Sequence, residues 1–235
     1  MMGLCMNLQS LFLWENFMVR SRLSDSELLK EIHKAAVQYQ SLLGHTFLIV
    51  GKNRKSEYFW FQCRFEKKNF MHLLGISSSS LRADKFYERA LEGNHCGQAN
   101  LSVQDCTPSR NHNRTTVNEK CSCCADLFRL EDAAYMKVGS KNKISQYVDF
   151  SYAYGRDEII GFERYKGSDE CFPITIIPRN IEEFSTRWYK VIFVFRKPAG
   201  ADRYERIPFA EMKKGLCNEL IGGFPADLRN LIQEE

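Results

Sequence analysis

No stretch of this sequence is apolar for long enough to cross a membrane, and the common motifs of nucleotide-binding and hydrolytic enzymes are missing. A spanning helix needs ~20 consecutive apolar residues, and no run approaches that length. The chain has no G-x-x-x-x-G-K-[ST] phosphate loop, no G-x-G-x-x-G, no H-E-x-x-H and no G-x-S-x-G, and it has no internal repeats. These absences argue against membrane proteins, P-loop ATPases, dinucleotide enzymes, zinc proteases and α/β-hydrolases.

The sequence also has little that marks a secreted protein. Residues 1–18 are apolar but interrupted by Asn7, Gln9, Ser10 and Glu15, and they lack the basic start and clear cleavage site of a signal peptide. The nine cysteines are odd in number and irregularly spaced, unlike the framework of a disulfide-rich domain. We therefore expect a cytoplasmic protein with reduced thiols and without a membrane partner.

The composition is that of a folded protein that tolerates a polyanionic partner. The 235 residues, of which 44% are hydrophobic, suffice for one domain with a sizeable core. The net charge is +4, and basic residues are in excess in residues 51–92 (nine Lys/Arg, five Asp/Glu) and 187–214 (eight against three). The aromatic residues among these charges either stack on unpaired bases or belong to the core; they include Tyr58, Trp60, Trp188 and Tyr189.

The first half of the chain predicts a helix followed by a β-hairpin. Ser24 and Glu27 form a capping-box pattern, and apolar residues then recur at helical spacing, which predicts a helix over residues 24–43. Thr46–Val50 and Glu57–Phe65 flank a basic turn and predict two paired strands. In the second strand, alternate residues form an apolar face for the core: Phe59, Phe61, Cys63 and Phe65.

A histidine follows directly after this strand. Phe70 to Gly75 (FMHLLG) predicts one helical turn closed by glycine, with His72 beside Lys67 and Lys68. Because a histidine exchanges protons near neutral pH, His72 is a candidate catalyst. The alternative is a half-buried histidine with a purely structural role.

The second half predicts antiparallel strands, which makes the fold class α+β. Short connections join three strand-like runs, and parallel strands would need longer crossovers. These runs are Glu158–Tyr165, Phe172–Pro178 and Trp188–Arg196. A helical segment over Asp126–Lys137 precedes them, and Pro208–Glu235 predicts a peripheral helical tail. The expected architecture is a set of N-terminal helices packed on an antiparallel β-sheet, with an early hairpin.

Residues 93–124 are polar, lack periodicity and are rich in cysteine and histidine, so they predict a poorly ordered insertion. Thiolate and imidazole are the ligands that zinc prefers, so a structural zinc site is the alternative for this segment. Its ligands would come from Cys106, Cys121, Cys123 and Cys124. Their spacing matches no standard zinc finger, and the primary expectation is that the protein needs no metal and no cofactor.

Three motifs in order resemble a nuclease family. They are the strand leading into Phe70–Gly75, with its F-x-H-L-x-G pattern, the helix with Phe86 and Tyr87, and the late strands with Ile160-Gly161-Phe162 and Pro173-x-Thr175. This order resembles the phage- and mobile-element-associated branch of the Barnase–EndoU–colicin–RelE-like (BECR) nucleases. The resemblance covers about residues 26–207, so we expect an N-terminal extension (1–23), a nuclease domain (24–207) that contains the insertion, and the tail (208–235).

The resemblance implies a sheet of four or five antiparallel strands and metal-independent cleavage of RNA, as in toxin-like endoribonucleases. It implies His72 and Thr175 as site residues. The partners would be RNA and, for a toxin-like nuclease, an immunity or antitoxin-like protein. Cations that would bind the phosphates are available on neighbouring segments: Arg82, Lys85, Arg164 and Lys166.

The chemistry of RNA cleavage without a metal explains these choices. The 2′-hydroxyl of the substrate attacks the phosphate, a base removes its proton, an acid protonates the leaving 5′-oxygen, and cations stabilise the phosphorane. His72 would be the base or acid, and Thr175 would bond a phosphate oxygen. Two other functions stay open: a binding protein with this fold and a decayed site, and a zinc-stabilised adaptor built around residues 93–124.

Overall fold

The first helix follows from its cap and its apolar stripe. In the computed structural model, which describes residues 23–143, 150–207 and 221–232, helix α2 runs over Asp25–Gln40. The backbone N–H of Glu27 donates to Ser24 Oγ at 3.3 Å, and the N–H of Ser24 donates to Glu27 Oε2 at 2.8 Å. This confirms the predicted capping box. The buried face consists of Leu28, Ile32, Ala35, Ala36 and Tyr39.

The predicted hairpin is also confirmed. Strand β1 (His45–Lys52) pairs antiparallel with β2 (Tyr58–Arg64), with Ile49 opposite Phe61. Phe61 and Cys63 are buried, whereas the alternate residues Trp60 and Gln62 are half-buried. The period of two therefore sets which face of β2 meets the core.

Helix α3 (Lys67–Leu73) begins earlier than the single predicted turn. The side chain of Asn69 explains the early start, because its Oδ1 accepts the backbone N–H of Glu66 at 3.0 Å. Gly75 follows the helix with φ +71°, the left-handed conformation that often ends helices. Helix α4 (Ala83–Glu92) comes next and buries Phe86 and Tyr87.

Among the described residues, one mostly antiparallel sheet of eight strands combines the β1–β2 hairpin with six strands from the second half of the chain. Its order is β1-β2-β8-β7-β6-β5-β9-β10, and β1 also pairs with β9, so the sheet closes on itself. The strands not yet given are β5 (Lys137–Ser140), β6 (Tyr152–Gly155), β7 (Ile159–Arg164), β8 (Glu170–Ile177), β9 (Trp188–Pro198) and β10 (Glu205–Arg206). The α+β class and the three predicted late strands are confirmed.

The number of strands and one pairing differ from the expectation. The sheet has eight strands rather than four or five, because the short strands β5 and β6 and the two-residue β10 carry too little pattern to be predicted. Strand β2 pairs in parallel with β8, at Gln62 opposite Glu170. The helices between β2 and β8 form part of this long crossover, which a prediction from short connections could not include.

The prediction that residues 93–124 form a poorly ordered insertion is wrong. They contain a short 3₁₀ turn (Val103–Asp105), strand β4 (Thr107–Pro108) paired with β3 (Ile76–Ser77), and most of helix α5 (Arg114–Leu127). Asn113 caps α5 by accepting the N–H of Thr116 at 2.9 Å. The predicted helix over Asp126–Lys137 is therefore misplaced, since α5 ends at Leu127 and a 3₁₀ turn (Leu130–Tyr135) precedes β5.

The four cysteines considered as zinc ligands are core residues. Cys106, Cys121, Cys123 and Cys124 are all buried in the main hydrophobic cluster. Burial raises the pKa of Cys121 and Cys124 well above the usual range and that of Cys106 to about 12, so these thiols stay protonated at neutral pH. In the described part of the chain, no group of three or more His, Cys, Asp or Glu side chains is arranged to hold an ion. The alternative of a zinc-stabilised segment is not supported, because cysteine here packs as a small hydrophobic residue.

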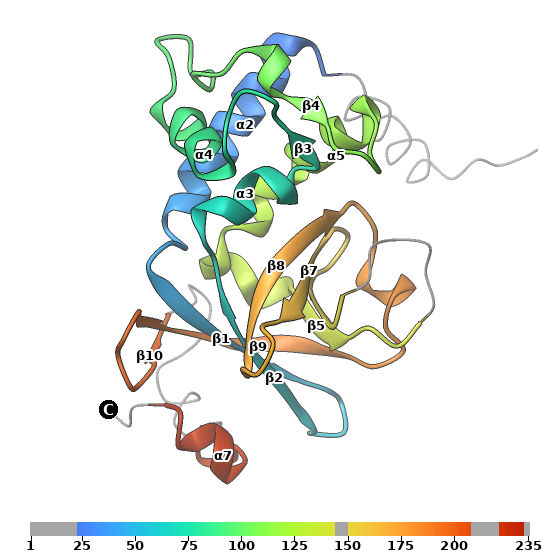
Figure 1. Cartoon of the computed structure of the whole chain (residues 1–235). Coiled ribbons are helices and arrows are strands. Elements are labelled where there is room, and N and C mark those ends of the chain that lie inside the picture. The colour runs from blue at the N-terminus through green and yellow to red at the C-terminus, as the bar shows by residue number, and fades with distance from the viewer. Residues whose placement is uncertain (1–22, 144–149, 208–220, 233–235) are drawn as a thin grey trace, which may run out of the picture.

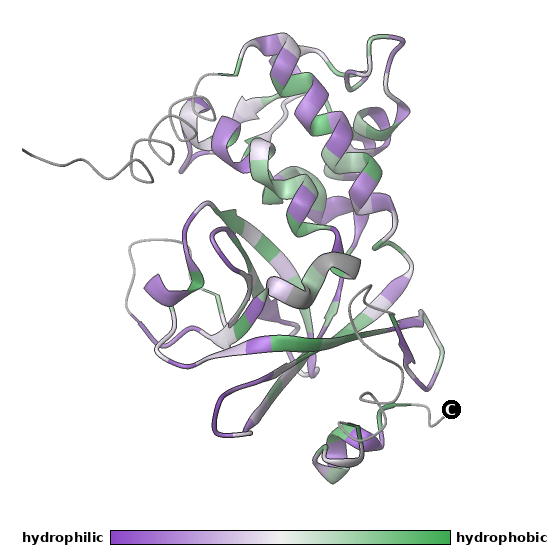
Figure 2. Ribbon diagram, turned by 180° about the vertical axis from the view of Figure 1, so that it is seen from behind, coloured by the Kyte–Doolittle hydropathy of each residue, from purple (hydrophilic) through white to green (hydrophobic). Residues whose placement is uncertain are grey.

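Helices α2, α3, α4 and α5 gather at one end of the molecule and the sheet lies at the other, as Figure 1 shows. The main cluster joins them, with residues from α2, α3 and α5 packed against residues of β1, β2 and β7. The long strands carry continuous hydrophobic stretches, green in Figure 2. Among the described residues, every helix is too short or too polar to span a bilayer.

A second, smaller cluster covers another part of the sheet. Helix α7 (Ala226–Arg229) contributes Leu228, and the ring of Phe224 lies 5.6 Å from that of Phe193 in β9. Within the described residues 221–232 of the predicted tail, residues 221–222 and α7 are helical. Residues 208–220 and 233–235, and residues 1–22 of the expected extension, lie outside the described residues.

Candidate functional site

A buried lysine bonded to the predicted site threonine is the main polar feature between the helices and the sheet. Lys120 of α5 is only 3% exposed, and its Nζ donates to Thr175 Oγ1 of β8 at 3.1 Å. Lysines are rarely buried unless a partner satisfies the ammonium group. Among the described residues, the acceptor for the Lys120 ammonium group is the hydroxyl of Thr175 and not a carboxylate.

A β-bulge and a glycine set the position of Thr175. The register shifts between Gly161 and Phe162 of β7, so Gly161 lies opposite Thr175 and Phe162 lies opposite Pro173. A bulge redirects the side chains beside it. A Cβ added to Gly161 would lie 3.1 Å from Thr175 Cγ2, so the glycine of the Ile160-Gly161-Phe162 motif leaves room for the threonine.

Burial brings the proton equilibrium of Lys120 close to neutral pH. It lowers the pKa of Lys120 to about 8, because the charged form loses its hydration. The hydroxyl of Thr175 donates in turn to the carbonyl of Ile176 at 3.2 Å, which leaves its oxygen lone pairs for the lysine. The pair therefore holds a positive charge that is easily lost above pH 8.

His112 lies close enough to Lys120 for the charge of the lysine to affect its pKa. Burial lowers the pKa of His112, and the charge of Lys120 lowers it further. The ring is half-buried, and its Nδ1 lies 2.8 Å from Ser109 Oγ. The hydroxyl thus engages one ring nitrogen and leaves Nε2 available to another partner.

Helix α3 connects this histidine to His72. A Cβ on Gly75 would lie 3.0 Å from His112 Cδ2. The His112 ring therefore packs directly against Gly75, the glycine that ends the F-x-H-L-x-G motif. His72 lies in the last turn of α3 and is exposed, and its carbonyl accepts the N–H of Gly75 at 3.0 Å. The same end of α3 therefore carries one histidine and supports the other.

A second pair of side chains links the same two elements. Burial raises the pKa of Glu119, which precedes Lys120 in α5, and the nearby Arg179 partly offsets that rise. Arg179 lies two residues beyond Ile177, the last residue of β8. The first half of α5 and the end of β8 thus carry two pairs, Lys120 with Thr175 and Glu119 with Arg179.

The four cations expected to bind phosphate lie elsewhere. On α4 and at its start, Lys85 Nζ is 2.6 Å from Glu88 Oε2, and Arg82 Nε is 3.4 Å from Asp84 Oδ1. Arg164 bonds the hydroxyl of Tyr152 and lies over its ring, and it lines an open pocket with Lys166 in the β7–β8 turn.

The register shows how far this turn is from Thr175. Arg164 lies opposite Cys171, four residues before Thr175 in β8. At about 3.3 Å per residue, this is roughly 13 Å along the strand. The structure therefore groups Arg164 with Lys166, and Thr175 with Lys120.

The sequence interpretation missed Lys120, Glu119 and His112 as site residues. A signal for Lys120 was present, because it falls on the buried stripe of α5 with Val117, Cys121 and Cys124. A charged residue on an apolar helix face is rare enough to mark a functional candidate. Because no helix is predicted over residues 93–124, the buried stripe of α5 is not apparent from the sequence.

Comparison with known proteins identifies a nuclease family. The model of the family described as phage-Barnase-EndoU-ColicinE5/D-RelE like nuclease4 matches residues 31–212. This range is most of the chain and includes His72, His112, Lys120 and Thr175. No curated protein and no solved structure gives a match.

Proposed function

The chain belongs to the family of phage-Barnase-EndoU-ColicinE5/D-RelE like nucleases, and on that premise we propose that it is a metal-independent endoribonuclease. The cleavage uses the ribose 2′-hydroxyl as the nucleophile. The products are one strand with a 2′,3′-cyclic phosphate and one with a 5′-hydroxyl. The observation that carries the proposal is the buried ammonium group of Lys120, held by Thr175 and close to His112.

The two histidines exchange the protons of the reaction. His112, whose pKa is lowered, is neutral at pH 7 and accepts the proton of the 2′-hydroxyl at Nε2. His72, exposed in the last turn of α3, donates a proton to the leaving 5′-oxygen. Each proton transfer requires a histidine within hydrogen-bond reach of its oxygen, and α3 supports both rings.

Lys120 and Thr175 do not touch the substrate in this scheme. Both side chains are 3% exposed, so in this role they stabilise charge and position their neighbours rather than exchange protons with the substrate. A positive charge in a poorly hydrated site acts more strongly on a developing phosphorane than the same charge in water. Arg179, which is exposed beyond β8, would contact a phosphate in this scheme.

The test is cleavage of a labelled RNA oligonucleotide by the purified protein in EDTA, with analysis of the product ends. We expect cleavage that persists in EDTA and yields 2′,3′-cyclic phosphates. Products with 3′-hydroxyl ends, or activity that EDTA removes and Mg²⁺ restores, would contradict the proposed reaction. Binding of RNA without any cleavage would instead support the alternative of a decayed site.

A further inference from the structure

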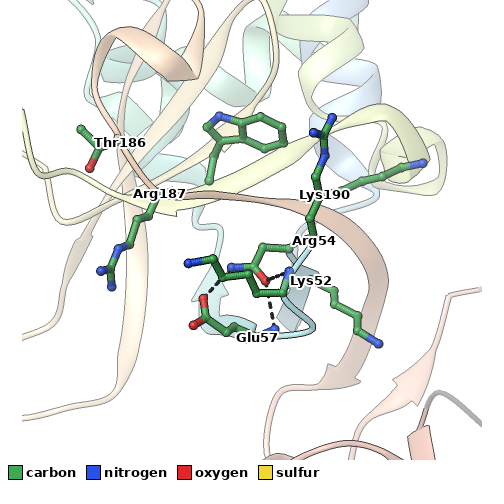
Figure 3. A pocket seen from close by; sticks show the side chains of 9 residues that line it. Lys52, Arg54, Glu57, Thr186, Arg187 and Lys190 are labelled. Carbon is green, nitrogen blue, oxygen red and sulfur yellow. Dashed lines mark hydrogen bonds between the residues drawn. The ribbon is translucent and has the colours of Figure 1, made fainter.

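A basic pocket lies at the tip of the β1–β2 hairpin, away from the helices. Its lining comes from the hairpin turn and from the segment that leads into β9: Lys52, Asn53, Arg54, Lys55, Glu57, Thr186, Arg187, Trp188 and Lys190. We call it the hairpin pocket. Figure 3 shows labelled cations from both segments around one space.

The hairpin pocket has a large excess of positive charge. Five of its residues are lysines or arginines, against the one carboxylate of Glu57. That carboxylate accepts a hydrogen bond from Asn53 Nδ2 at 2.6 Å. Among the residues that the structure describes, none of the five cations is in an ion pair, so their charge is available to a ligand.

The strand register places lysines directly opposite one another. Lys190 of β9 pairs with Lys52 of β1 on one side and with Lys137 of β5 on the other. Like charges in directly opposed positions destabilise a sheet. Among the described residues, Lys137 alone of these three has a carboxylate partner, Glu182 at 2.6 Å. Repulsion among these three lysines destabilises the free protein, and their charge favours binding of a polyanion.

Trp188 adds an aromatic surface to these charges. It lines the pocket and is 37% exposed, one of the few large hydrophobic side chains at the surface. The ammonium group of Lys137 lies 4.0 Å from the centre of its ring. Cations that follow a backbone, combined with an exposed aromatic ring on which a base stacks, are the features of sites for unpaired nucleic acid strands.

The register also limits the distance from this pocket to the candidate catalytic site. Trp188 lies opposite Gly139 of β5, which lies opposite Ala153 of β6. Ala153 lies opposite Gly161 of β7, which lies opposite Thr175 of β8. Four cross-strand steps of about 5 Å give at most about 20 Å between Trp188 and Thr175. A stacked strand has one phosphate per about 3.4 Å, so this distance corresponds to about six nucleotides.

We propose that the hairpin pocket is an accessory site for single-stranded RNA, in which the cations contact phosphates and Trp188 stacks on a base. It binds the substrate several nucleotides away from the scissile bond. Long RNAs occupy both sites, whereas oligonucleotides shorter than the separation occupy one. The inference rests on the proposed cleavage of RNA, but binding to the pocket is measured without cleavage.

The test is the affinity of a 20-nucleotide 2′-O-methyl RNA, which has no free 2′-hydroxyl, measured by fluorescence anisotropy over a range of salt. In the variant Arg54→Gln/Lys55→Gln/Lys190→Gln, loss of three phosphate contacts reduces the slope of log K against log salt by about 2 and the affinity at 50 mM salt by about 10²-fold. The matched control is Lys30→Gln/Lys34→Gln, which removes exposed cations from α2. Unchanged binding in the triple variant would overturn the proposal.

Three further measurements separate the alternatives. Trp188→Ala is expected to weaken binding of the single strand at least about fivefold, and Trp188→Phe to retain most of it. In the triple variant, cleavage of a five-nucleotide RNA is expected to stay unchanged while KM for a 20-nucleotide RNA rises. Binding to phosphatidylserine vesicles through the same cations, without binding of the oligonucleotide, would overturn the proposal in favour of a lipid surface. Binding that fits the proposal in a protein that cleaves no RNA would defeat only the proposed function.

Discussion

Lys120 and the hairpin pocket use positive charge in opposite ways. Lys120 is a single buried ammonium group, held by one hydroxyl between the helices and the sheet. The hairpin pocket presents five cations to solvent at the far end of β1 and β2, with an exposed tryptophan. Both lie in a chain whose net charge is only +4, so position rather than total charge distinguishes them.

The difference follows from hydration. A buried charge acts strongly on its neighbours, and its own pKa falls because water no longer stabilises the charged form. An exposed cation acts weakly by itself and is screened by salt, so binding requires several together. We therefore expect changes at the buried pair to alter chemistry and stability, and changes at the hairpin pocket to alter affinity and its salt dependence.

The largest expected effect concerns His72, the proposed general acid. His72→Ala should lower the rate of RNA cleavage by about 10²–10⁴, the usual contribution of a general acid or base. The fold should be retained, because His72 is exposed. His95→Ala, another exposed histidine, is the matched control and should cleave at the normal rate. Equal rates in the two variants would remove His72 from the reaction.

The second prediction tests whether Lys120 is as poorly hydrated as the structure shows. Its pKa is about 8 in the folded protein and 10.5 in the unfolded chain, so between these values the unfolded state binds more protons and stability rises with pH. Relative to Lys120→Met, the free energy of unfolding of the wild-type protein should rise by about 2 kcal/mol from pH 7.5 to 9.5. Urea denaturation of both proteins measures this difference, which should be flat below pH 8. A pH-independent difference would contradict the burial of the charge.

The third prediction isolates the contact between Gly75 and His112. Gly75 has φ +71° and Gly44 has φ +76°, but only Gly75 has a neighbour where a Cβ would lie. Alanine in this conformation costs about 1–2 kcal/mol, so both Gly75→Ala and Gly44→Ala should lower stability. Only Gly75→Ala should also slow cleavage, because it displaces the ring of His112. Slower cleavage in both variants would show that the loss follows from stability alone.

The smallest effect is expected in the row of opposed lysines. Lys190→Gln removes repulsion with Lys52 and Lys137, and should raise stability by about 0.2–1 kcal/mol at low salt. The same substitution should weaken binding of single-stranded RNA. Thermal unfolding at low and high salt measures the first effect, and Lys30→Gln serves as the control. A loss of stability at low salt would contradict the repulsion.

The elements that were predicted correctly have strong local signals. The capping box and apolar stripe located α2, the alternation of apolar residues located β2, and three late runs located β7, β8 and β9. Residues 93–124 were misread because their cysteines were interpreted as polar ligands, although buried cysteine behaves as a hydrophobic residue. When Cys121 and Cys124 are counted as apolar residues, they form a continuous stripe with Val117 at helical spacing. This stripe predicts α5.

The contacts within the candidate site could not be predicted from local sequence patterns either. His72 and Thr175 were selected from motifs, and the structure adds that Thr175 bonds Lys120 and that Gly75 supports His112. These contacts join residues about 40 to 55 positions apart in the chain. Local patterns do not encode them, because they depend on how α5 packs against α3 and β8.

The central claim, attack by the 2′-hydroxyl, is tested most directly by a DNA strand that contains a single ribonucleotide. The wild-type protein should cleave this strand only on the 3′ side of the ribose and in EDTA, leaving a 2′,3′-cyclic phosphate. The same strand without the ribonucleotide should bind with similar affinity and stay intact. Cleavage of the all-deoxy strand, or cleavage away from the ribose, would contradict the account.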